Sequence, residues 1–179
     1  MPYSTVDKRV LFDGKKVRLE LHKVEDDNGK RHEREVVAHP GAVLVLGELD
    51  DGRILMIKVR RYPVGGEMIW ELPAGTLEKG EEPINCAGRE LQEETGYLAG
   101  KMSPMGWFYT SPGILTERMY CFLATKLQAG EQALEEGEEI DVHALPFEDV
   151  MQMIKDGDIV DGKTIAALLR YAQFRRGNA

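Results

Sequence analysis

Two kinds of hydrophobic periodicity occur along the chain, and together they predict a mixture of strands and helices. Alternating apolar and polar positions, or short apolar runs bounded by turn residues, predict strands at 16–24, 31–37, 42–46, 54–59, 105–109, 118–124 and 140–145. Apolar positions at helical spacing predict helices at 83–95, 147–155 and 162–174. Because strands and helices are mixed without strict β–α–β alternation, the pattern indicates an α/β fold in which helices cover both faces of a mixed sheet.

The N-terminal part of the chain predicts a β-hairpin extension. The turn sequence Asp26-Asp27-Asn28-Gly29 separates its two predicted strands. An isolated hairpin buries little apolar surface and is marginally stable, so residues of about 10 to 37 are expected to need cover. That cover is either the hairpin's own domain or a second copy of the chain.

Composition narrows the class of protein. A chain of 179 residues with 42% hydrophobic residues can bury one good core, so residues 1–179 are expected to form a single domain. The net charge of −8 without a basic cluster disfavours nucleic acid and anionic membranes as partners. No apolar run reaches the length of a membrane span or resembles a signal peptide, which predicts a cytoplasmic protein. Cys86 and Cys121 lack metal-ligand spacing and are expected to be buried thiols.

Three acids on one predicted helix are the strongest candidates for chemistry. Glu90, Glu93 and Glu94 stand at i, i+3 and i+4 near the end of helix 83–95, where mutual repulsion and the helix dipole both disfavour them. They share an arc of about 100° away from the apolar stripe. A hard cation such as Mg²⁺ or Mn²⁺ prefers such oxygen ligands. The alternative is a solvated acidic face, which explains most charge runs.

The spacing around these acids resembles a complete Nudix box at residues 75–97. Gly75 is followed after five residues by Glu81, and after seven more by Arg89-Glu90-Leu91-Gln92-Glu93-Glu94-Thr95-Gly96-Tyr97. The family usually has an aliphatic residue at the last position, where a tyrosine ring can supply the apolar packing. The resemblance implies a Nudix α/β/α sandwich and metal-dependent hydrolysis.

The resemblance also implies particular metal ligands. Glu90 and Glu94 are the first choices, joined by the backbone carbonyl of Ala74, and Glu93 is expected to bind a further cation or to take part in catalysis. Arg89 is expected to orient these acids through ion pairs. Glu81 is expected to be structural, tying the box loop to the helix.

Further stretches resemble the subgroup of ADP-ribose and nucleoside-diphosphate-sugar pyrophosphatases. They are Arg61-Tyr62-Pro63-Val64-Gly65-Gly66, Trp70-Glu71-Leu72-Pro73-Ala74-Gly75, Thr110-Ser111-Pro112-Gly113 and Glu117. Pro112 lies sixteen residues after Gly96, as is usual in the subgroup. Ahead of Arg61 the chain departs from the subgroup's usual Gln and aromatic residue, because it has Val59 and Arg60.

Substrate-binding residues follow from the same resemblance. An arginine suits a diphosphate oxygen because its planar fork donates paired hydrogen bonds, which makes Arg61 the candidate for that contact. The resemblance assigns Pro112 to the substrate site. It also implies that Glu35 reads the substrate across the interface of a homodimer whose N-terminal strands, in residues of about 1–40, are exchanged.

The acidic loop Leu134–Val142 is the expected source of the general base. Glu138 occupies the position at which the subgroup has a glutamate that reaches the metal cluster, with Glu136 and Glu139 as alternatives. His143 is a base by residue type, but it alternates with apolar strand residues, which favours a structural role. Metal-bound water is itself acidic, so the residues leave the identity of the base open.

The function implied is hydrolysis of the diphosphate of ADP-ribose, or of a related nucleoside-diphosphate sugar, to a nucleoside monophosphate and a sugar phosphate with Mg²⁺ or Mn²⁺. A GDP-mannose-type sugar nucleotide is the alternative substrate. A sensor that binds such nucleotides without cutting them is the alternative from another class, although such proteins usually lose box acids that this chain retains.

Overall fold

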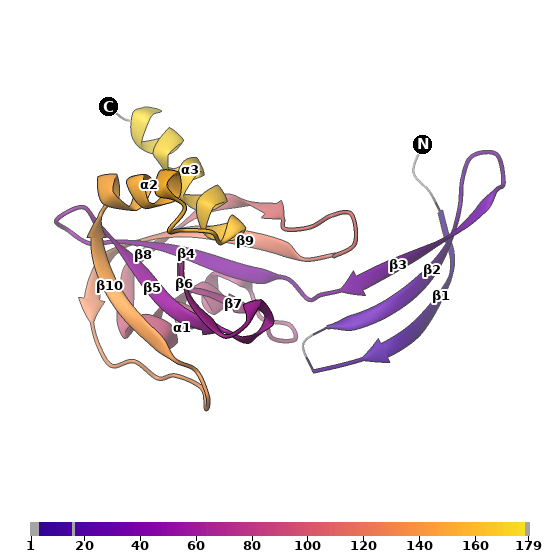
Figure 1. Cartoon of the computed structure of the whole chain (residues 1–179), viewed down its shortest axis with the longest axis horizontal. Coiled ribbons are helices and arrows are strands. Elements are labelled where there is room, and N and C mark those ends of the chain that lie inside the picture. Colours follow the sequence, from indigo (N-terminus) through magenta and orange to yellow (C-terminus); the bar gives the residue numbers. More distant parts are fainter. Residues whose placement is uncertain (1–3, 16, 178–179) are drawn as a thin grey trace. The chain divides into compact units, whose positions relative to one another are not determined.

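The chain forms two compact units in a computed structural model that describes residues 4–15 and 17–177. The first unit contains the described residues up to Gly41 together with Tyr109–Arg118. The second unit contains Ala42–Phe108 and the described residues from Met119 onward. All the α-helices belong to this second unit (Figure 1).

The described part of the chain contains ten strands, one 3₁₀ helix and three α-helices. The first unit contains β1 (Ser4–Asp13), β2 (Arg18–Glu25) and β3 (Arg31–Ala38). Next come β4 (Ala42–Glu48), β5 (Arg53–Arg61), β6 (Glu67–Glu71), β7 (Ala74–Thr76), β8 (Tyr97–Tyr109), β9 (Arg118–Ala129) and β10 (Ile140–Pro146). The helices are the 3₁₀ helix η1 (Tyr62–Val64) and the α-helices α1 (Pro83–Thr95), α2 (Phe147–Asp156) and α3 (Gly162–Gly177).

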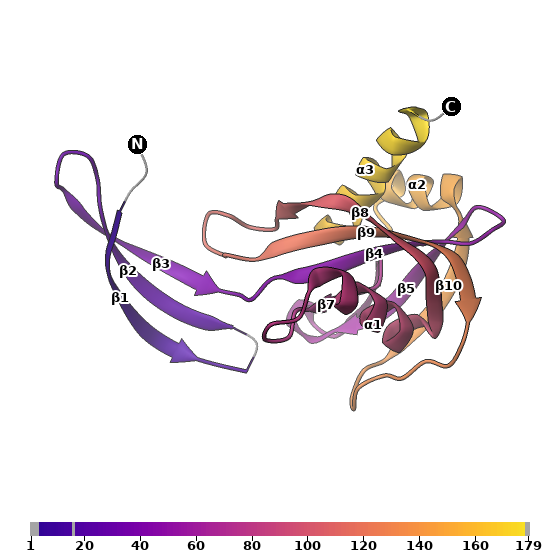
Figure 2. The ribbon, with the colours of Figure 1, turned by 180° about the vertical axis from the view of Figure 1, so that it is seen from behind.

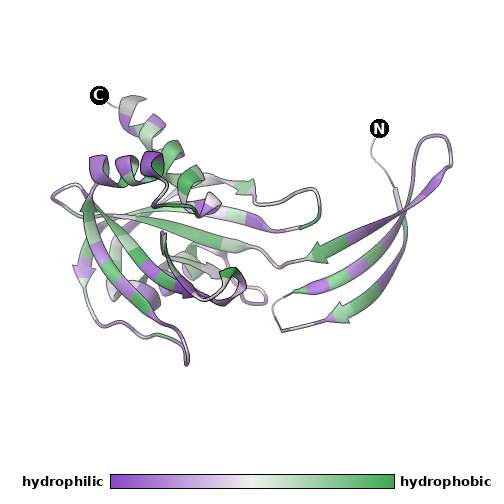
Figure 3. Ribbon diagram, in the orientation of Figure 1, coloured by the Kyte–Doolittle hydropathy of each residue, from purple (hydrophilic) through white to green (hydrophobic). Residues whose placement is uncertain are grey.

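The second unit is built on a seven-stranded mixed sheet. Its strand order is β10-β5-β4-β9-β8, with β6 paired to β5 and β7 paired to β4. β4 runs parallel to β9 and antiparallel to β5 and β7. Both faces of β4 are buried, and the strand reads as a nearly continuous apolar run (Figure 3), as expected for a central strand covered on both sides.

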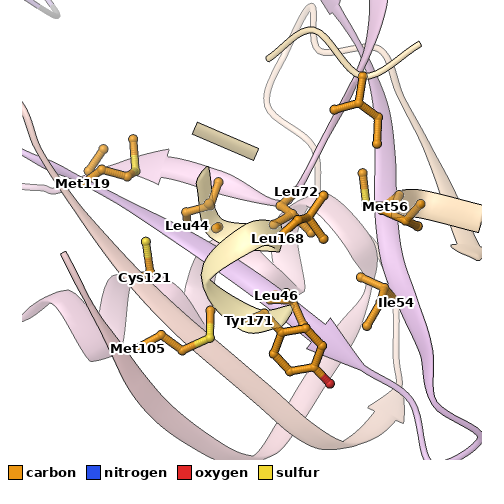
Figure 4. Close-up of a cluster of buried hydrophobic side chains, with 14 residues drawn as sticks. Leu44, Leu46, Ile54, Met56, Leu72, Met105, Met119, Cys121, Leu168 and Tyr171 are labelled. Carbon is orange, nitrogen blue, oxygen red and sulfur yellow. The ribbon is translucent and has the colours of Figure 1, made fainter. Parts of the chain in front are cut away.

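Successive residues of β4 enter two different cores, which defines the layers. Leu44 and Leu46 pack with α2 and α3 on one face, around Leu168 and Tyr171 (Figure 4). Val43 and Val45 pack against α1 on the other face, around Leu91. Figures 1 and 2 show the same arrangement, with α2 and α3 on one side of the sheet and α1 on the other. The expected α/β/α sandwich is therefore confirmed.

The first unit is a three-stranded antiparallel sheet in the order β1-β2-β3. The expected hairpin is present as β2 and β3, which are joined at the turn 26–29. β1 adds a strand that the sequence pattern did not predict, and all of its residues are exposed. The segment 109–118 is joined to β3 by two backbone hydrogen bonds, from the Val37 amide to the Ile114 carbonyl at 2.8 Å and from the Thr116 amide to the Val37 carbonyl at 3.0 Å.

Most other predicted elements are confirmed with shifted ends. Lys16, at which the strand prediction 16–24 began, lies outside the described residues. The strand predicted at 105–109 is the last part of the longer β8, and β6 and β7 were not predicted. Cys86 and Cys121 are free and buried, as expected. None of the helices in the described part of the chain is both long and apolar enough to span a membrane.

Candidate active site

Local sequence determines how α1 presents its acids. Pro83 stands at the start of the helix, and Gly96 ends it in a left-handed conformation, donating its amide to the Gln92 carbonyl at 2.8 Å. Cys86, Ala87 and Leu91 face the core. The acids at 90, 93 and 94 therefore project from the flank of a helix whose other side is fixed by packing. Tyr97 is half-buried and packs against the same core, as the box requires of its last position.

Arg89 links the box acids. Its Nε and Nη2 donate to the two carboxylate oxygens of Glu81 at 3.0 and 3.1 Å, and its Nη1 donates to Glu90 at 2.8 Å and to Glu93 at 2.9 Å. The guanidinium holds the pKa of Glu81 at about 2. Glu81 also accepts the Glu78 amide at 3.0 Å. The structural role expected of Glu81 and the orienting role expected of Arg89 both agree with these contacts.

Gly75 gives the Glu90 carboxylate its place beside strand β7. A Cβ atom added at Gly75 would lie 1.8 Å from Cδ of Glu90 and 1.9 Å from its Oε1. The backbone of Gly75 is not in the left-handed region, so glycine is needed here for space and not for its dihedral angles. Burial raises the pKa of Glu90 above its usual value, and the charges of Glu93 and Glu138 act in the same direction.

Glu94 is the most deeply buried of the three acids on α1, with 5% of its surface exposed. Burial raises its pKa to about 8, opposed mainly by a hydrogen bond from the Ala74 amide to Oε2 at 2.9 Å. Nearby Glu90 and Glu138 also raise its pKa, whereas Arg61 lowers it. Glu94 therefore lies against the backbone of Ala74. These two residues are the ones that the sequence predicts to bind the same metal ion.

Arg61 is held by a buried acid that the sequence analysis did not single out. Its Nε and Nη2 donate to the carboxylate of Glu71 at 2.7 and 2.9 Å, and Glu71 is only 1% exposed. Lys163 of α3 also pairs with Glu71, and with Asp161 at 3.0 Å. Burial alone would raise the pKa of Glu71, but Arg61 and Lys163 hold it below its usual value.

This pairing fixes the direction of Arg61. Because Nε and Nη2 bind Glu71, Nη1 is left without a hydrogen bond to any described residue. The hydrogen bonds to Glu71, and to a smaller extent the charge of Glu94, raise the pKa of the guanidinium. The arginine is thus fixed on one edge and has donors on the other. A sequence signal for Glu71 existed: an acid between Trp70 and Leu72, in a segment otherwise expected to be buried, needs a cationic partner.

The three glutamates of the acidic loop that are candidates for the general base have different contacts. Glu139 binds Arg60 through Nε at 2.8 Å, and its carbonyl accepts the Arg60 amide at 3.2 Å. Glu138 is exposed, accepts the Glu135 amide at 3.0 Å, and acts electrostatically on both Glu90 and Glu94. Glu136 is exposed in the turn. The assignment of Glu138 as general base, with Glu136 and Glu139 as alternatives, stays a prediction.

Two expected substrate residues belong to the first unit. Glu35 is exposed on β3, opposite Leu21 of β2. Pro112 is exposed in a turn in which the amides of Ile114 and Leu115 donate to the Ser111 carbonyl at 3.1 and 2.8 Å. The substrate-binding roles of both residues stay predictions. His143, by contrast, packs edge-on against Trp70 with ring centroids 4.7 Å apart, which agrees with a structural role.

The carboxylates of α1 are suitable ligands for a divalent cation, but they do not converge on one point. Among the described residues, no three His, Cys, Asp or Glu side chains stand close enough together to form a metal site. The reason is visible in the contacts: Arg89 binds Glu90 and Glu93, while Glu94 binds the Ala74 amide. Buried carboxylates with raised pKa values lack positive charge, which a divalent cation would supply.

Comparison with known proteins agrees with this site. The family model of the NUDIX domain matches residues 38–168. The chain is 43% identical to an ADP-ribose pyrophosphatase of Bacillus subtilis over 96% of this chain and 93% of that protein. It is 39% identical to a methanol dehydrogenase activator of Bacillus methanolicus over the same shares.

Two further comparisons extend the picture. The chain is 39% identical to a GDP-mannose pyrophosphatase of Yersinia pestis over 74% of this chain and 70% of that protein. The crystal structure of an ADP compounds hydrolase superposes with a TM-score of 0.87 at 20% identity, covering 100% of this chain and 97% of that one, which shows a shared fold. The box geometry on α1, the matching family model and the extent of these similarities lead to one conclusion: this chain belongs to the Nudix family.

Proposed function

We propose that this protein is a Nudix pyrophosphohydrolase that cleaves the diphosphate bond of ADP-ribose, or of a related nucleoside-diphosphate sugar, to a nucleoside monophosphate and a sugar phosphate. The observation that carries the proposal is the pair of partly desolvated carboxylates, Glu90 and Glu94, beside strand β7 in a complete Nudix box. The ADP-ribose pyrophosphatase that is similar over nearly the whole chain supports ADP-ribose as substrate.

The proposed cofactor is Mg²⁺ or Mn²⁺, in keeping with the general use of divalent metals by Nudix hydrolases. Glu90, Glu94 and the Ala74 carbonyl would hold one cation, and Glu93 a further one. Such a cation neutralises phosphate charge and acidifies water when bound. Arg89 orients the carboxylates of Glu90 and Glu93 through its hydrogen bonds to both.

The protein's own groups supply the other requirements. Arg61 has an unpaired edge at Nη1 that can donate to a diphosphate oxygen while Glu71 holds the other edge still. A carboxylate oxygen of Glu138 takes the proton of the attacking water. Glu35 is proposed to read the substrate across the interface of the homodimer, and Pro112 is proposed to bind the substrate.

The second candidate substrate is a GDP-mannose-type sugar nucleotide. The specific observation in its favour is the 39% identity to GDP-mannose pyrophosphatase. That similarity covers less of the chain than the similarity to ADP-ribose pyrophosphatase, which favours ADP-ribose. The chain differs from the usual sequence of the subgroup at Val59 and Arg60, just ahead of Arg61. Because Arg60 binds Glu139 of the acidic loop, we place the difference between ADP-ribose and GDP-mannose specificity at this point.

We also propose a cytoplasmic homodimer that exchanges its N-terminal strands. The first unit exposes apolar side chains on and after β1, namely Val6, Val10, Leu11, Phe12 and Val17. An apolar row of this kind on an edge strand calls for cover by another chain. Sedimentation is expected to show a species of about 40 kDa, twice the 20.1 kDa chain, and Val10→Asp should shift it toward monomer. A wild-type monomer would refute the exchange.

Turnover of the purified protein tests the function directly. With Mg²⁺ or Mn²⁺, a phosphate-coupled assay should compare ADP-ribose, GDP-mannose, UDP-glucose, NAD⁺ and ATP. We expect the highest kcat/KM for ADP-ribose, release of AMP, and loss of activity on chelation of the cation. Saturable binding of a sugar nucleotide without cleavage of any substrate would refute the enzyme and indicate a sensor.

A further inference from the structure

The segment between β9 and β10 is attached to the end of the box helix. Residues 130–139 have no regular secondary structure apart from a turn, yet this segment contains Glu138. The amide of Gly130 donates to the Gly96 carbonyl at 2.6 Å, and the amide of Ala133 donates to the Glu93 carbonyl at 2.9 Å. The loop is therefore attached to the end of α1, although most of its residues are exposed.

Gln132 provides the side-chain contact of this attachment. Its Nε2 donates to the Glu94 carbonyl at 2.6 Å and lies 3.5 Å from the Ile140 carbonyl at the start of β10. The last carbonyls of an α-helix have no partner within the helix and need donors from elsewhere. Gln132 and Ala133 thus satisfy the carbonyls of Glu94 and Glu93, the two residues whose side chains face the site.

The fit at this point is tight. A Cβ atom added at Gly96 would lie 3.0 Å from the Gln132 amide nitrogen and 3.2 Å from the Gly130 carbonyl oxygen. The far end of the segment is fixed as well, through Arg60 and Glu139. In between, Glu138 closes a turn with Glu135 by two contacts of 3.1 and 3.0 Å. A loop held at both ends and closed in its middle has little freedom to move its carboxylate.

We infer that Gln132 is a positioning residue: by binding the C-terminal end of α1, it holds the acidic segment so that Glu138 faces the carboxylates of the box. Glu138 already acts electrostatically on Glu90 and Glu94, in agreement with this placement. The inference rests on the proposed function for the catalytic role of Glu138. The attachment of the loop to the helix can be tested independently of that role.

Gln132→Glu is the sharpest variant. It keeps the size of the side chain but replaces the donor with an acceptor-only carboxylate, next to carbonyls at the negative end of the helix dipole. We expect kcat for ADP-ribose to fall about tenfold or more while KM stays within about twofold, because orientation is lost and substrate contacts are kept. Gln132→Ala should give a smaller fall of kcat in the same direction.

Amide hydrogen exchange provides a readout that does not depend on turnover. In Gln132→Glu, exchange should accelerate at residues 133–139 and stay unchanged in the first two turns of α1. The matched control is Gln152→Glu on α2, where the Gln152 amide binds Asp156 at 2.9 Å. This control should leave kcat, KM and the exchange of residues 133–139 at wild-type values.

Two results would overturn the inference. One is a Gln132→Glu variant with wild-type kcat. The other is accelerated exchange throughout α1 with kcat and KM changed together, which would indicate a purely structural contact. If wild-type protein cleaves none of the substrates, the proposed function fails on that observation alone, and the exchange of residues 133–139 still decides whether Gln132 holds the segment.

Discussion

Gly75→Ala tests whether the box glycine is required for the space it leaves to Glu90. The added Cβ would lie 1.8 Å from Cδ of Glu90, whereas real Cβ contacts are essentially never shorter than 3.0 Å. The carboxylate must therefore retreat by about 1 Å or more, or strand β7 must move. A displacement of about 1 Å at a reacting centre lowers turnover by about 100-fold, which corresponds to about 2.7 kcal/mol of activation free energy.

Stability should change far less than turnover. The backbone of Gly75 is compatible with alanine, and such a substitution stabilises by about 0.4–1 kcal/mol through the unfolded chain. Against this, the partly exposed Arg89–Glu90 ion pair is disturbed, and pairs of this kind contribute at most about 1 kcal/mol. The two effects nearly cancel, so the Tm of Gly75→Ala should lie within a few degrees of wild type.

The assay is phosphate-coupled hydrolysis of ADP-ribose, with Tm measured on the same preparation. Gly88→Ala on α1 is the matched control, because a Cβ there meets no atom within 4 Å. It should raise the free energy of unfolding by about 0.8–1 kcal/mol, as alanine does relative to glycine within a helix, and leave kcat unchanged. If Gly75→Ala keeps at least half of the wild-type kcat, the steric argument is wrong.

The remaining predictions concern the buried acids Glu94 and Glu71. The pKa of Glu94 is raised to about 8, so the contribution of this residue to the free energy of unfolding is complete below about pH 4.5 and is lost as pH rises through 8. Without divalent cations, the Tm of wild type should therefore fall more between pH 5 and 8 than the Tm of Glu94→Gln. Parallel Tm profiles of the two proteins would contradict this. Glu94→Gln should also remain folded yet lose turnover by orders of magnitude. Glu71→Ala leaves Arg61 without its carboxylate partner and Lys163 with Asp161 alone, and should lower the urea-derived free energy of unfolding by about 3 kcal/mol. Glu139→Ala, which breaks an exposed pair, should change it by about 0.5 kcal/mol or less, and an equal loss in both variants would refute the buried network.

Features that depend on residues close together in the chain could be predicted from the sequence. Helix α1 follows from Pro83, the apolar stripe and Gly96, and the orientation of Glu90, Glu93 and Glu94 follows from helical spacing. Arg89 contacts Glu81, eight positions away, and Glu93, four positions away. Both partners belong to the Nudix box, so the motif itself indicates these contacts. The two sides of the sandwich could be predicted because β4 is apolar at every inward position on both faces.

Some strands were missed because their local pattern is irregular. β1 mixes charged and apolar residues, and its pairing with β2 shifts register between Thr5 and Asp7 and again between Val10 and Phe12, so clean alternation is lost. The part of β8 that was not predicted contains Gly100 and Pro104, which indicate a turn in a sequence window. In the folded chain these residues are accommodated within a single long strand.

Contacts between distant segments could not be predicted from the sequence. Glu71 and Lys163 are 92 positions apart, and Gln132 and Glu94 are 38 apart, so neither pair falls within the range of helical or strand periodicity. These contacts depend on the strand order, which brings α3 to Glu71 and the segment before β10 to the end of α1. The local sequence does indicate which groups need a partner, since buried charges and the carbonyls at the end of a helix must be paired. Which residues satisfy them was fixed by how the layers pack.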